Sequence, residues 1–209
     1  MAVYHDARCR MCRRSGMKLF LKGARCFTDK CAIERRGYAP GEHGKSRRVK
    51  ETNYGQQLRE KQKARQIYGL LERQFRHYFS KASEAKGVTG EVLLQMLERR
   101  LDNVLYRANF TLSRSQGRQV VRHGHVKVNG RTVDIPSFLV KPGDTVEIRE
   151  KSRKLALILT TIEARKGQGA PEWLDVSTDS LTAKVLSVPT RQSIPIPINE
   201  QLIVELYSK

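Results

Sequence analysis

The four cysteines of the chain all lie within one short basic segment. Cys9 and Cys12 form a C-x2-C pair, thirteen residues follow, and Cys26 and Cys31 form a C-x4-C pair. A C-x2-C turn aims two thiolates at one ion, and a second pair completes a tetrahedron around Zn²⁺. Because every ligand would be a cysteine, no coordination position stays open, so the spacing predicts a structural metal. An iron–sulfur cluster also takes four thiolates and is the alternative cofactor.

The segment that would hold this cluster has a small apolar content. Its large apolar side chains are chiefly Leu19, Phe20, Leu21, Phe27 and Ile33. A bound metal would therefore supply part of the folding free energy of an N-terminal lobe. Redox-active disulfides and uncoordinated thiols are further readings of the same cysteines.

Positive charge dominates the composition and is unevenly distributed. The 209 residues include 40 Lys and Arg against 21 Asp and Glu, a formal net charge of +19. Residues 1–50 hold 14 of these cations against 4 acids, residues 51–169 hold 23 against 12, and residues 170–209 hold 3 against 5. A field of this strength attracts polyanions, so nucleic acid or an anionic membrane surface is the first expectation. We predict a nucleic-acid partner for the first two segments and a protein neighbour for the last.

The sequence contains no targeting or membrane signal that we can identify. No apolar run approaches the roughly 18 residues that span a bilayer. The opening residues MAVYHDARCR lack the apolar region of a secretory signal. We therefore expect a cytoplasmic protein, in which thiols stay reduced and structural disulfides are rare.

A basic arm follows the last cysteine. Glycines and prolines between residues 37 and 44 argue against a regular element. The alternative is a solvated linker, but the charge of the first 50 residues favours an arm that lies on phosphates. Its candidate contacts are Arg35, Arg36, Lys45, Arg47 and Arg48.

Residues 51–108 carry helical patterns. Asn53 is a plausible cap for a helix over 54–69, and apolar residues at helical spacing predict a second helix over 70–85. Leucines at helical spacing predict one long amphipathic helix from about 90 to 108, with Arg99, Arg100 and Arg107 on its polar face.

The stretch from 110 to 149 has the strongest local signals. Ser113 and Gln116 have the spacing of a capping box, Gly124 suits a left-handed helix end, and Asn129-Gly130 marks a hairpin before the strand TVEIRE. A solvated helix face is the alternative to an RNA-binding surface, but seven cationic or titratable groups and no acid lie between residues 114 and 131. The RNA contacts that we predict in this part of the chain are Arg100, Arg114, Arg118, Arg122, His123 and Lys127. Further on, LALILTTIEA predicts an apolar strand, and the tail predicts a final strand or short helix.

These residues resemble a known family. LERRLDNVLYRANFTLSRSQGRQVVRHGHVKVNG and the following VDIPSFLVKPGDTVEI resemble the RNA-binding module named after bacterial small ribosomal subunit protein four. ERRGYAPGEHGKSRR and NYGQQLREKQKARQIYG resemble the arm and first helices of that ribosomal protein itself. The four-cysteine start resembles its zinc-binding variety, and the resemblance covers nearly the full chain.

The resemblance implies an α+β fold in three parts. These are a metal-bound lobe and arm over 1–50, a helical domain over 51–98 completed by 189–209, and an inserted α+β RNA-binding domain with a small antiparallel sheet over 99–188. It also implies a primary rRNA-binding protein that nucleates assembly of the small-subunit body at a helical junction of the 16S-type rRNA 5′ domain. Contact with ribosomal protein five, a position where mRNA enters the subunit and a role in translational accuracy are implied as well.

Two other classes of function compete with this reading. An RNA-modifying enzyme could use the same module for docking, but the chain leaves little room for a separate catalytic domain of about 100 residues. We find neither a G-x4-G-K-[ST] loop nor an H-E-x-x-H motif, so we expect no enzyme. A zinc-dependent DNA-binding regulator is the other class, and a preference for DNA over structured RNA would favour it.

Overall fold

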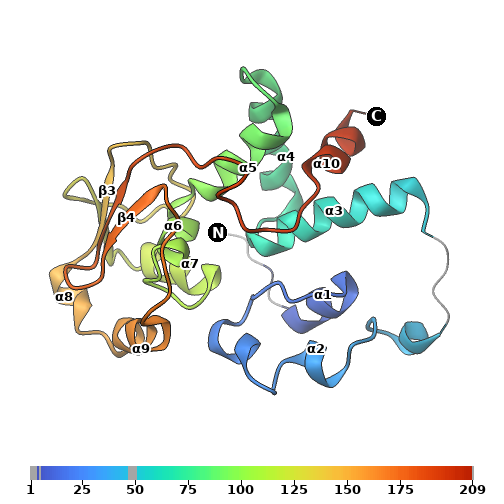
Figure 1. Cartoon of the computed structure of the whole chain (residues 1–209), viewed down its shortest axis with the longest axis horizontal. Coiled ribbons are helices and arrows are strands. Elements are labelled where there is room, and N and C mark those ends of the chain that lie inside the picture. The colour runs from blue at the N-terminus through green and yellow to red at the C-terminus, as the bar shows by residue number, and fades with distance from the viewer. Residues whose placement is uncertain (1–3, 5, 47–50, 209) are drawn as a thin grey trace. The chain divides into compact units, whose positions relative to one another are not determined.

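A computed structural model describes residues 4, 6–46 and 51–208, and it has an α+β fold (Figure 1). The chain divides into two compact units. Unit 1 comprises the described residues up to Leu93 together with those from Ile196 onward, and unit 2 is Leu94–Pro195. The boundaries predicted from the sequence were 50/51, 98/99 and 188/189. The two-unit division has no boundary near 50, but in both descriptions a continuous segment is inserted into a unit that the tail completes.

Unit 1 begins with four short helical segments. They are α1 (Arg8–Ser15), the 3₁₀ turn η1 (Gly23–Phe27), α2 (Ala32–Arg35) and the 3₁₀ turn η2 (Glu42–Lys45). Leu19 is almost fully buried, whereas Phe27 is exposed. The small apolar content that the sequence indicated therefore gives this segment little core of its own.

Three further helices of unit 1 pack together. They are α3 (Asn53–Ile67), α4 (Glu72–Glu84) and the final helix α10 (Glu200–Tyr207), which packs against α3. The cap of α3 is Thr52, whose hydroxyl accepts a hydrogen bond from the N–H of Gly55 at 3.1 Å, so the expectation of Asn53 as the cap was one residue off. The tail forms a helix, which settles the choice left open by the sequence.

A polar cluster ties α10 to α3 and α4. Glu72 accepts hydrogen bonds from Lys61 Nζ at 2.7 Å and Tyr207 Oη at 3.0 Å, and the rings of Phe79 and Tyr207 stack at 4.4 Å. Burial raises the pKa of Glu72, but the hydrogen bonds from Lys61 and Tyr207 outweigh it, so the pKa is lowered overall. Burial and the bond to Glu72 both raise the pKa of Tyr207. The end of the chain is thus part of the packed structure of unit 1.

The single long helix predicted from about 90 to 108 is two helices. They are α5 (Thr89–Glu98), which contains the boundary between the units, and α6 (Leu101–Arg107). Arg100 is extended and forms a β-bridge with Leu139, and the N–H of Leu101 donates to Phe138 O at 2.9 Å. The helix is interrupted because this backbone pairs with a distant segment, which apolar spacing alone does not reveal.

Unit 2 is built on a five-stranded antiparallel sheet in the order β2-β1-β3-β5-β4. Its strands are β1 (Val126–Val128), β2 (Arg131–Thr132), β3 (Thr145–Ile148), β4 (Leu174–Ser177) and β5 (Thr182–Val185). The hairpin predicted at Asn129-Gly130 is confirmed: both residues have positive φ, 50° and 77°, and Val128 pairs with Arg131.

The helices of unit 2 after α6 are α7 (Arg114–Arg122), α8 (Glu150–Arg153) and α9 (Ala156–Arg165). The strand predicted over LALILTTIEA is wrong, because this run forms α9. Ile158 and Thr161, three residues apart, are fully buried while Leu157 and Leu159 are exposed, which is helical and not alternating spacing.

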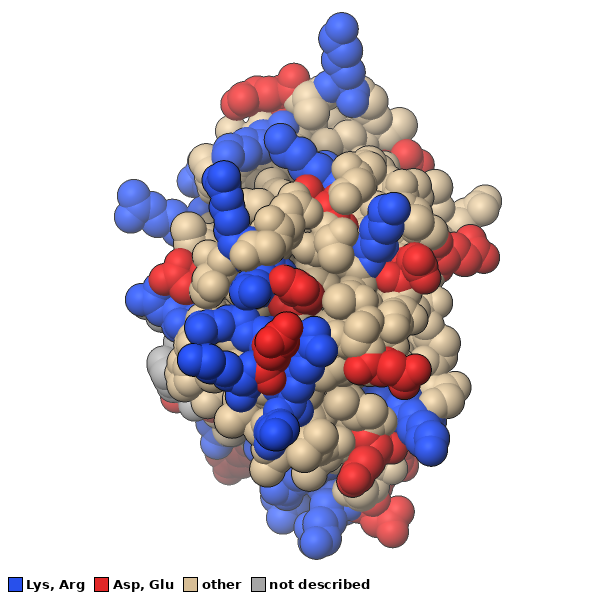
Figure 2. Space-filling model, turned by 90° about the vertical axis from the view of Figure 1, so that its left-hand side faces the viewer, with Lys and Arg blue, Asp and Glu red and all other residues tan. Residues whose placement is uncertain are grey.

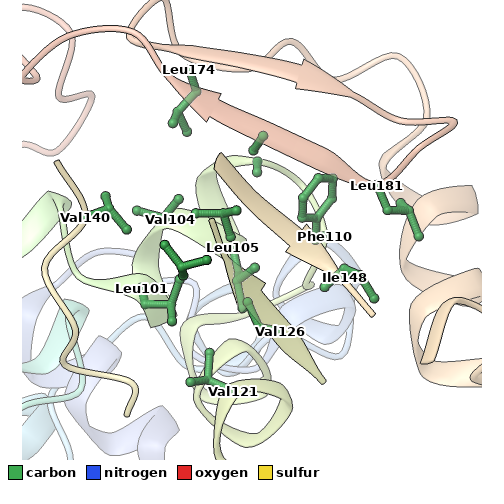
Figure 3. Close-up of a cluster of buried hydrophobic side chains, with 14 of the residues drawn as sticks. Leu101, Val104, Leu105, Phe110, Val121, Val126, Val140, Ile148, Leu174 and Leu181 are labelled. Carbon is green, nitrogen blue, oxygen red and sulfur yellow. The ribbon is translucent and has the colours of Figure 1, made fainter. Parts of the chain in front are cut away.

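The hydrophobic core of unit 2 lies between α6, α7 and the sheet. Figure 3 shows Leu101, Val104 and Leu105 of α6 beside Val126 of β1 and Ile148 of β3. The only tryptophan of the sequence, Trp173, belongs to the same cluster and is 2% exposed. Its fluorescence therefore reports on the folding of unit 2. Among the helices that the structure describes, none is both long and apolar enough to cross a membrane.

Candidate RNA interface and cysteine cluster

Helix α7 begins at the predicted cap, Ser113, with the reciprocal bond of a capping box displaced by one residue to Leu112. Ser113 Oγ accepts a hydrogen bond from the N–H of Gln116 at 3.3 Å, and Gln116 Oε1 accepts one from the N–H of Leu112 at 2.7 Å. Two N–H groups at the helix start are thereby satisfied. At the other end Gly124 has φ 70°, and its N–H donates to Val121 O at 2.9 Å, which confirms the left-handed ending.

Gly117 allows α7 to approach α6 closely. A Cβ at this position would lie 2.6 Å from Asp102 O and 3.2 Å from Thr111 Oγ1. Because a backbone carbonyl cannot move aside like the end of a flexible side chain, a methyl group there requires the helix to shift. The position of the cations on α7 therefore depends on a glycine that sequence analysis did not single out.

We expect Gly117→Ala to lower the free energy of unfolding of unit 2 by about 1–3 kcal/mol, the usual cost of overpacking. This holds although alanine is about 1 kcal/mol better than glycine in a helix. Urea unfolding followed by Trp173 fluorescence measures the change. Gly169→Ala is the matched control, since a Cβ there meets nothing within 4 Å, and a surface change should cost less than about 0.5 kcal/mol. Equal effects from the two variants would contradict the steric explanation.

The predicted RNA contacts on α7 and the hairpin differ in their exposure. Arg122 and His123 are exposed, whereas Arg114 and Lys127 are half-buried. Acidic residues distant in sequence approach two of them: Asp134 lies 4.0 Å from Arg122, and Glu147, opposite Lys127 in the sheet, lies 3.8 Å from it. These pairs are partly or fully solvated, so they contribute little to stability. Figure 2 shows one face of the molecule, on which Lys and Arg gather mainly toward the left side with acidic residues among them.

Arg100 and Arg118 do not have the outward positions that the sequence indicated. Arg100 is 1% exposed. Its guanidinium forms a bidentate ion pair with Asp102, with Nε–Oδ1 and Nη2–Oδ2 distances of 3.1 and 2.6 Å. It is turned inward because the helix is interrupted there. Arg118 is 9% exposed, since it lies on the same face of α7 as the buried Val121, three residues on. The outward placement of both was therefore wrong.

Arg114 is held by two neighbours at the start of α7. Its Nε donates to Asn103 Oδ1 at 2.7 Å, and its guanidinium carbon lies 4.5 Å from the centroid of the Tyr106 ring. Asn103 in turn donates from Nδ2 to Glu98 Oε2 at 2.8 Å, and Arg107 donates to both carboxylate oxygens of Glu98 at 2.7 and 2.8 Å. Arg114 thus belongs to a partly buried polar network.

The basic arm carries exposed cations beside a hollow. Arg35, Arg36 and Lys45 are exposed, whereas Arg47 and Arg48 lie outside the described residues. The Tyr38 ring has Lys45 Nζ 5.1 Å and the Arg13 guanidinium carbon 4.9 Å from its centroid. A hollow of about 690 Å³ adjoins these side chains, and its cationic lining consists of Arg13, Arg14, Lys45 and Arg59, with His43 beside them. Sequence analysis missed Arg13, because nothing local indicates that it reaches the arm.

The four cysteines come from three consecutive segments of unit 1. Cys9 and Cys12 lie on α1, Cys26 on η1, and Cys31 directly before α2. All four line one small cavity of about 20 Å³, and three of them are buried. The N–H of Lys22 donates to Cys26 Sγ at 3.3 Å. Both halves of the motif therefore line the same cavity.

The sulfur atoms are neighbours but do not form a closed coordination shell. All four thiols are free of disulfides. No group of three or more His, Cys, Asp or Glu side chains in residues 4, 6–46 and 51–208 has the arrangement of a metal site. Burial raises the pKa of Cys12; the N–H of Leu19 opposes this, and Cys26, Cys9 and Cys31 raise the pKa further. Four thiol sulfurs are the kind of donor that a thiophilic ion takes, although their present arrangement is not that of a metal site.

The matches to known sequence families define the class of protein. The family described as "Ribosomal protein S4/S9 N-terminal domain" matches residues 3–98, and the "S4 domain" family matches residues 99–146. The second match contains α6, α7 and the β1–β2 hairpin. These matches define a ribosomal protein with an S4 RNA-binding domain, which is a class of structural protein and not of enzyme.

Similarity over the whole chain identifies the family. The chain is 59% identical to small ribosomal subunit protein uS4 of Acidobacterium capsulatum, 56% identical to that of Thermoanaerobacter sp. strain X514 and 58% identical to that of Geobacter sp. strain M21. Each alignment spans 209 residues and 100% of both chains. The chain belongs to the small ribosomal subunit protein uS4 family.

Proposed function

We propose that this member of the family is a primary rRNA-binding protein that nucleates assembly of the small-subunit body. Its target would be a helical junction in the 5′ domain of the 16S-type rRNA. The observation that carries the proposal is the cationic surface of α7 and the β1–β2 hairpin, with Arg114, Arg122, His123 and Lys127 at exposed or half-buried positions. The exposed Arg131 on β2 extends this surface.

The chemistry of these side chains suits duplex RNA. An RNA helix presents phosphates and 2′-hydroxyls along a shallow minor groove, so it is recognised mainly by shape. Arginine serves this purpose because its planar guanidinium donates two parallel hydrogen bonds to one phosphate. Arg100 is left out of the proposed contact surface, because its guanidinium is committed to Asp102 inside unit 2. Arg118 would act at the edge of the surface.

We further infer that the arm contacts rRNA and lines the path by which mRNA enters the subunit. Arg35, Arg36 and Lys45 support this by their exposure, and Arg47 and Arg48 would extend the same run of charge. The acidic balance of residues 170–209, 3 cations against 5 acids, supports contact with a protein neighbour. We propose ribosomal protein five as that neighbour, and through it a contribution to translational accuracy in the cytoplasmic ribosome.

We infer that Cys9, Cys12, Cys26 and Cys31 hold one structural Zn²⁺, with an iron–sulfur cluster as the alternative. The shared cavity and the N–H donated to Cys26 Sγ support this assignment. Bound metal would supply a cross-link between α1, η1 and α2 and no catalytic chemistry. The cysteines would close around the ion and fix the cationic side chains of the lobe, which then lose less conformational freedom when RNA binds.

The proposal predicts a steep dependence of RNA affinity on salt. If about 8 phosphates are neutralised, log Kd should change with log salt concentration with a slope of magnitude about 6. Combining Arg122→Gln with Lys127→Gln should reduce this magnitude by about 1.5. The measurement is a salt titration of the full chain on a small-subunit rRNA fragment that contains the 5′-domain junction.

Two controls make this test decisive. Lys184→Gln removes the same kind of charge from an exposed position on β5, within the acidic part of the chain, and should leave the slope unchanged. Random RNA and duplex DNA serve as competitors. Equal affinity for random RNA at moderate salt, or preferential binding of DNA, would rule out the proposed function.

A further inference from the structure

We propose that α9 positions the RNA-facing Arg114 through Arg165 and the Tyr106 ring, and so sets the RNA affinity of α7 without contacting RNA itself. This inference rests on the proposed function, because it assigns a positioning residue to the same surface. Residues 156–165 of α9 lie beyond residues 99–146, which match the S4 domain. The residues that position the RNA-binding surface would therefore include some that lie outside that module.

Arg165 and Arg114 share one aromatic ring. The guanidinium carbon of each lies 4.5 Å from the centroid of Tyr106. A cation over an aromatic face is attracted by the ring quadrupole, and the attraction grows as the pair is desolvated. Arg114 and Arg165 are both half-buried, so the ring is a common platform that limits the positions each guanidinium can take.

Arg165 also fixes the loop that joins α6 to α7. Its Nη1 donates to Asn109 Oδ1 at 2.7 Å and to Tyr106 O at 3.3 Å, and its Nη2 donates to Leu112 O at 3.2 Å. Asn109 has φ 63°, an uncommon conformation for a residue other than glycine. A planar fork that reaches three oxygen atoms is a property of arginine that lysine does not share.

A second contact joins α9 to the first turn of α7. Thr161 is fully buried. Its Oγ1 accepts a hydrogen bond from Gln116 Nε2 at 3.2 Å. Gln116 is the same residue whose Oε1 accepts from the N–H of Leu112. Successive turns of α9 thus hold the cap of α7 and the loop before it.

Replacing Arg165 should lower the affinity for RNA because Arg114 becomes less ordered. It should not remove a direct contact between Arg165 and a phosphate. An arginine that is already ordered loses less rotamer freedom when it binds a phosphate, and that freedom is worth a factor of about 2 to 12 in Kd. We expect Arg165→Met and Arg165→Lys each to weaken binding about five-fold. The lysine variant is informative, since it keeps the positive charge and loses the fork.

The test is a double-mutant cycle on the full chain with the 5′-domain rRNA fragment. Arg114→Met should weaken binding about ten-fold, and adding Arg165→Met should weaken it by less than a further two-fold, because the residues act through one contact. Lys166→Met removes an exposed neighbouring cation and is the matched control. Trp173 fluorescence during urea unfolding verifies that unit 2 is still folded in each variant.

A measurement without RNA separates positioning from general stability. The Nε–H resonance of Arg114, bonded to Asn103 in the wild type, should exchange faster with water in Arg165→Lys. Tyr106→Leu should have the same effect, whereas Tyr106→Phe, which keeps the ring, should not. If Arg165→Met unfolds unit 2, the lysine and Tyr106 variants still decide the question.

Three outcomes would overturn the inference. Wild-type affinity in Arg165→Lys would mean that Arg165 contributes only charge. Fully multiplicative losses in the double variant would mean that Arg165 contacts RNA by itself. If the wild type fails to bind the fragment with the expected salt dependence, the proposed function fails, and this inference fails with it, whereas the first two outcomes leave the proposed function intact.

Discussion

Replacing Glu98 with glutamine should lower the free energy of unfolding of unit 2 by about 3 kcal/mol, because it leaves the charge of Arg107 without its counterion. The side chain of Glu98 is 1% exposed and that of Arg107 is 12% exposed, with 2.7 Å between their closest atoms. Glu98 also accepts from Asn103 Nδ2 at 2.8 Å. Removing one partner of a buried pair costs about 3–5 kcal/mol, far more than the net contribution of a surface pair.

Urea unfolding followed by Trp173 fluorescence measures this effect. Glu172→Gln, at an exposed position of the same unit, should change the free energy by less than about 0.5 kcal/mol. Replacing both Glu98 and Arg107 with methionine should cost less than the sum of the single changes, since no charge is then left buried. Additive losses, or a cost of Glu98→Gln near that of the control, would show that the pair is not buried in solution.

Cys26→Ser should abolish metal binding and unfold residues 8–36 without affecting unit 2. A structural zinc site in a small peptide supplies about 10–16 kcal/mol of apparent binding free energy, more than the entire stability of many domains. The lobe has little core to compensate, since Leu19 is well buried but Phe27 is exposed. We expect elemental analysis to give about one zinc per wild-type chain and none in the variant.

Limited proteolysis with trypsin locates the change. New cleavage should appear after Lys22, Arg25 and Lys30, while the urea unfolding curve from Trp173 stays as in the wild type. Thr28→Ser, a conservative change at an exposed position beside η1, is the matched control. An unchanged cleavage pattern contradicts the structural role of the cluster, and iron with visible absorbance assigns the site to an iron–sulfur cluster.

Local signals in the sequence predicted those features that local interactions create. The helix cap at Ser113, the left-handed Gly124 and the turn at Asn129-Gly130 each depend on a few adjacent residues, and all three are confirmed. The four cysteines line one cavity, but the metal site that their spacing predicts stays a prediction. Membership of the small ribosomal subunit protein uS4 family and the α+β class are likewise confirmed, whereas the zinc-binding variety of that family stays a prediction.

The features that the sequence did not reveal depend on contacts between distant segments. Arg100 is buried because residues 136–140 pair with the chain where the predicted helix is interrupted. The run that forms α9 is apolar along most of its length, so its helical spacing is visible only once Ile158 and Thr161 are known to be the buried positions. Tyr106 and Arg165 are separated by 59 residues, and nothing near either indicates that they meet.

The packing of α10 against α3 has a consequence for the order in which the protein matures. Translation proceeds from the N-terminus, and domains generally fold as units once their residues are made. Unit 2 is one continuous segment, Leu94–Pro195, so all of it is synthesised before the first residue of α10. Helix α3 is synthesised more than a hundred residues before α10 and cannot pack against it until α10 has been made. Unit 1 is therefore begun first and completed last.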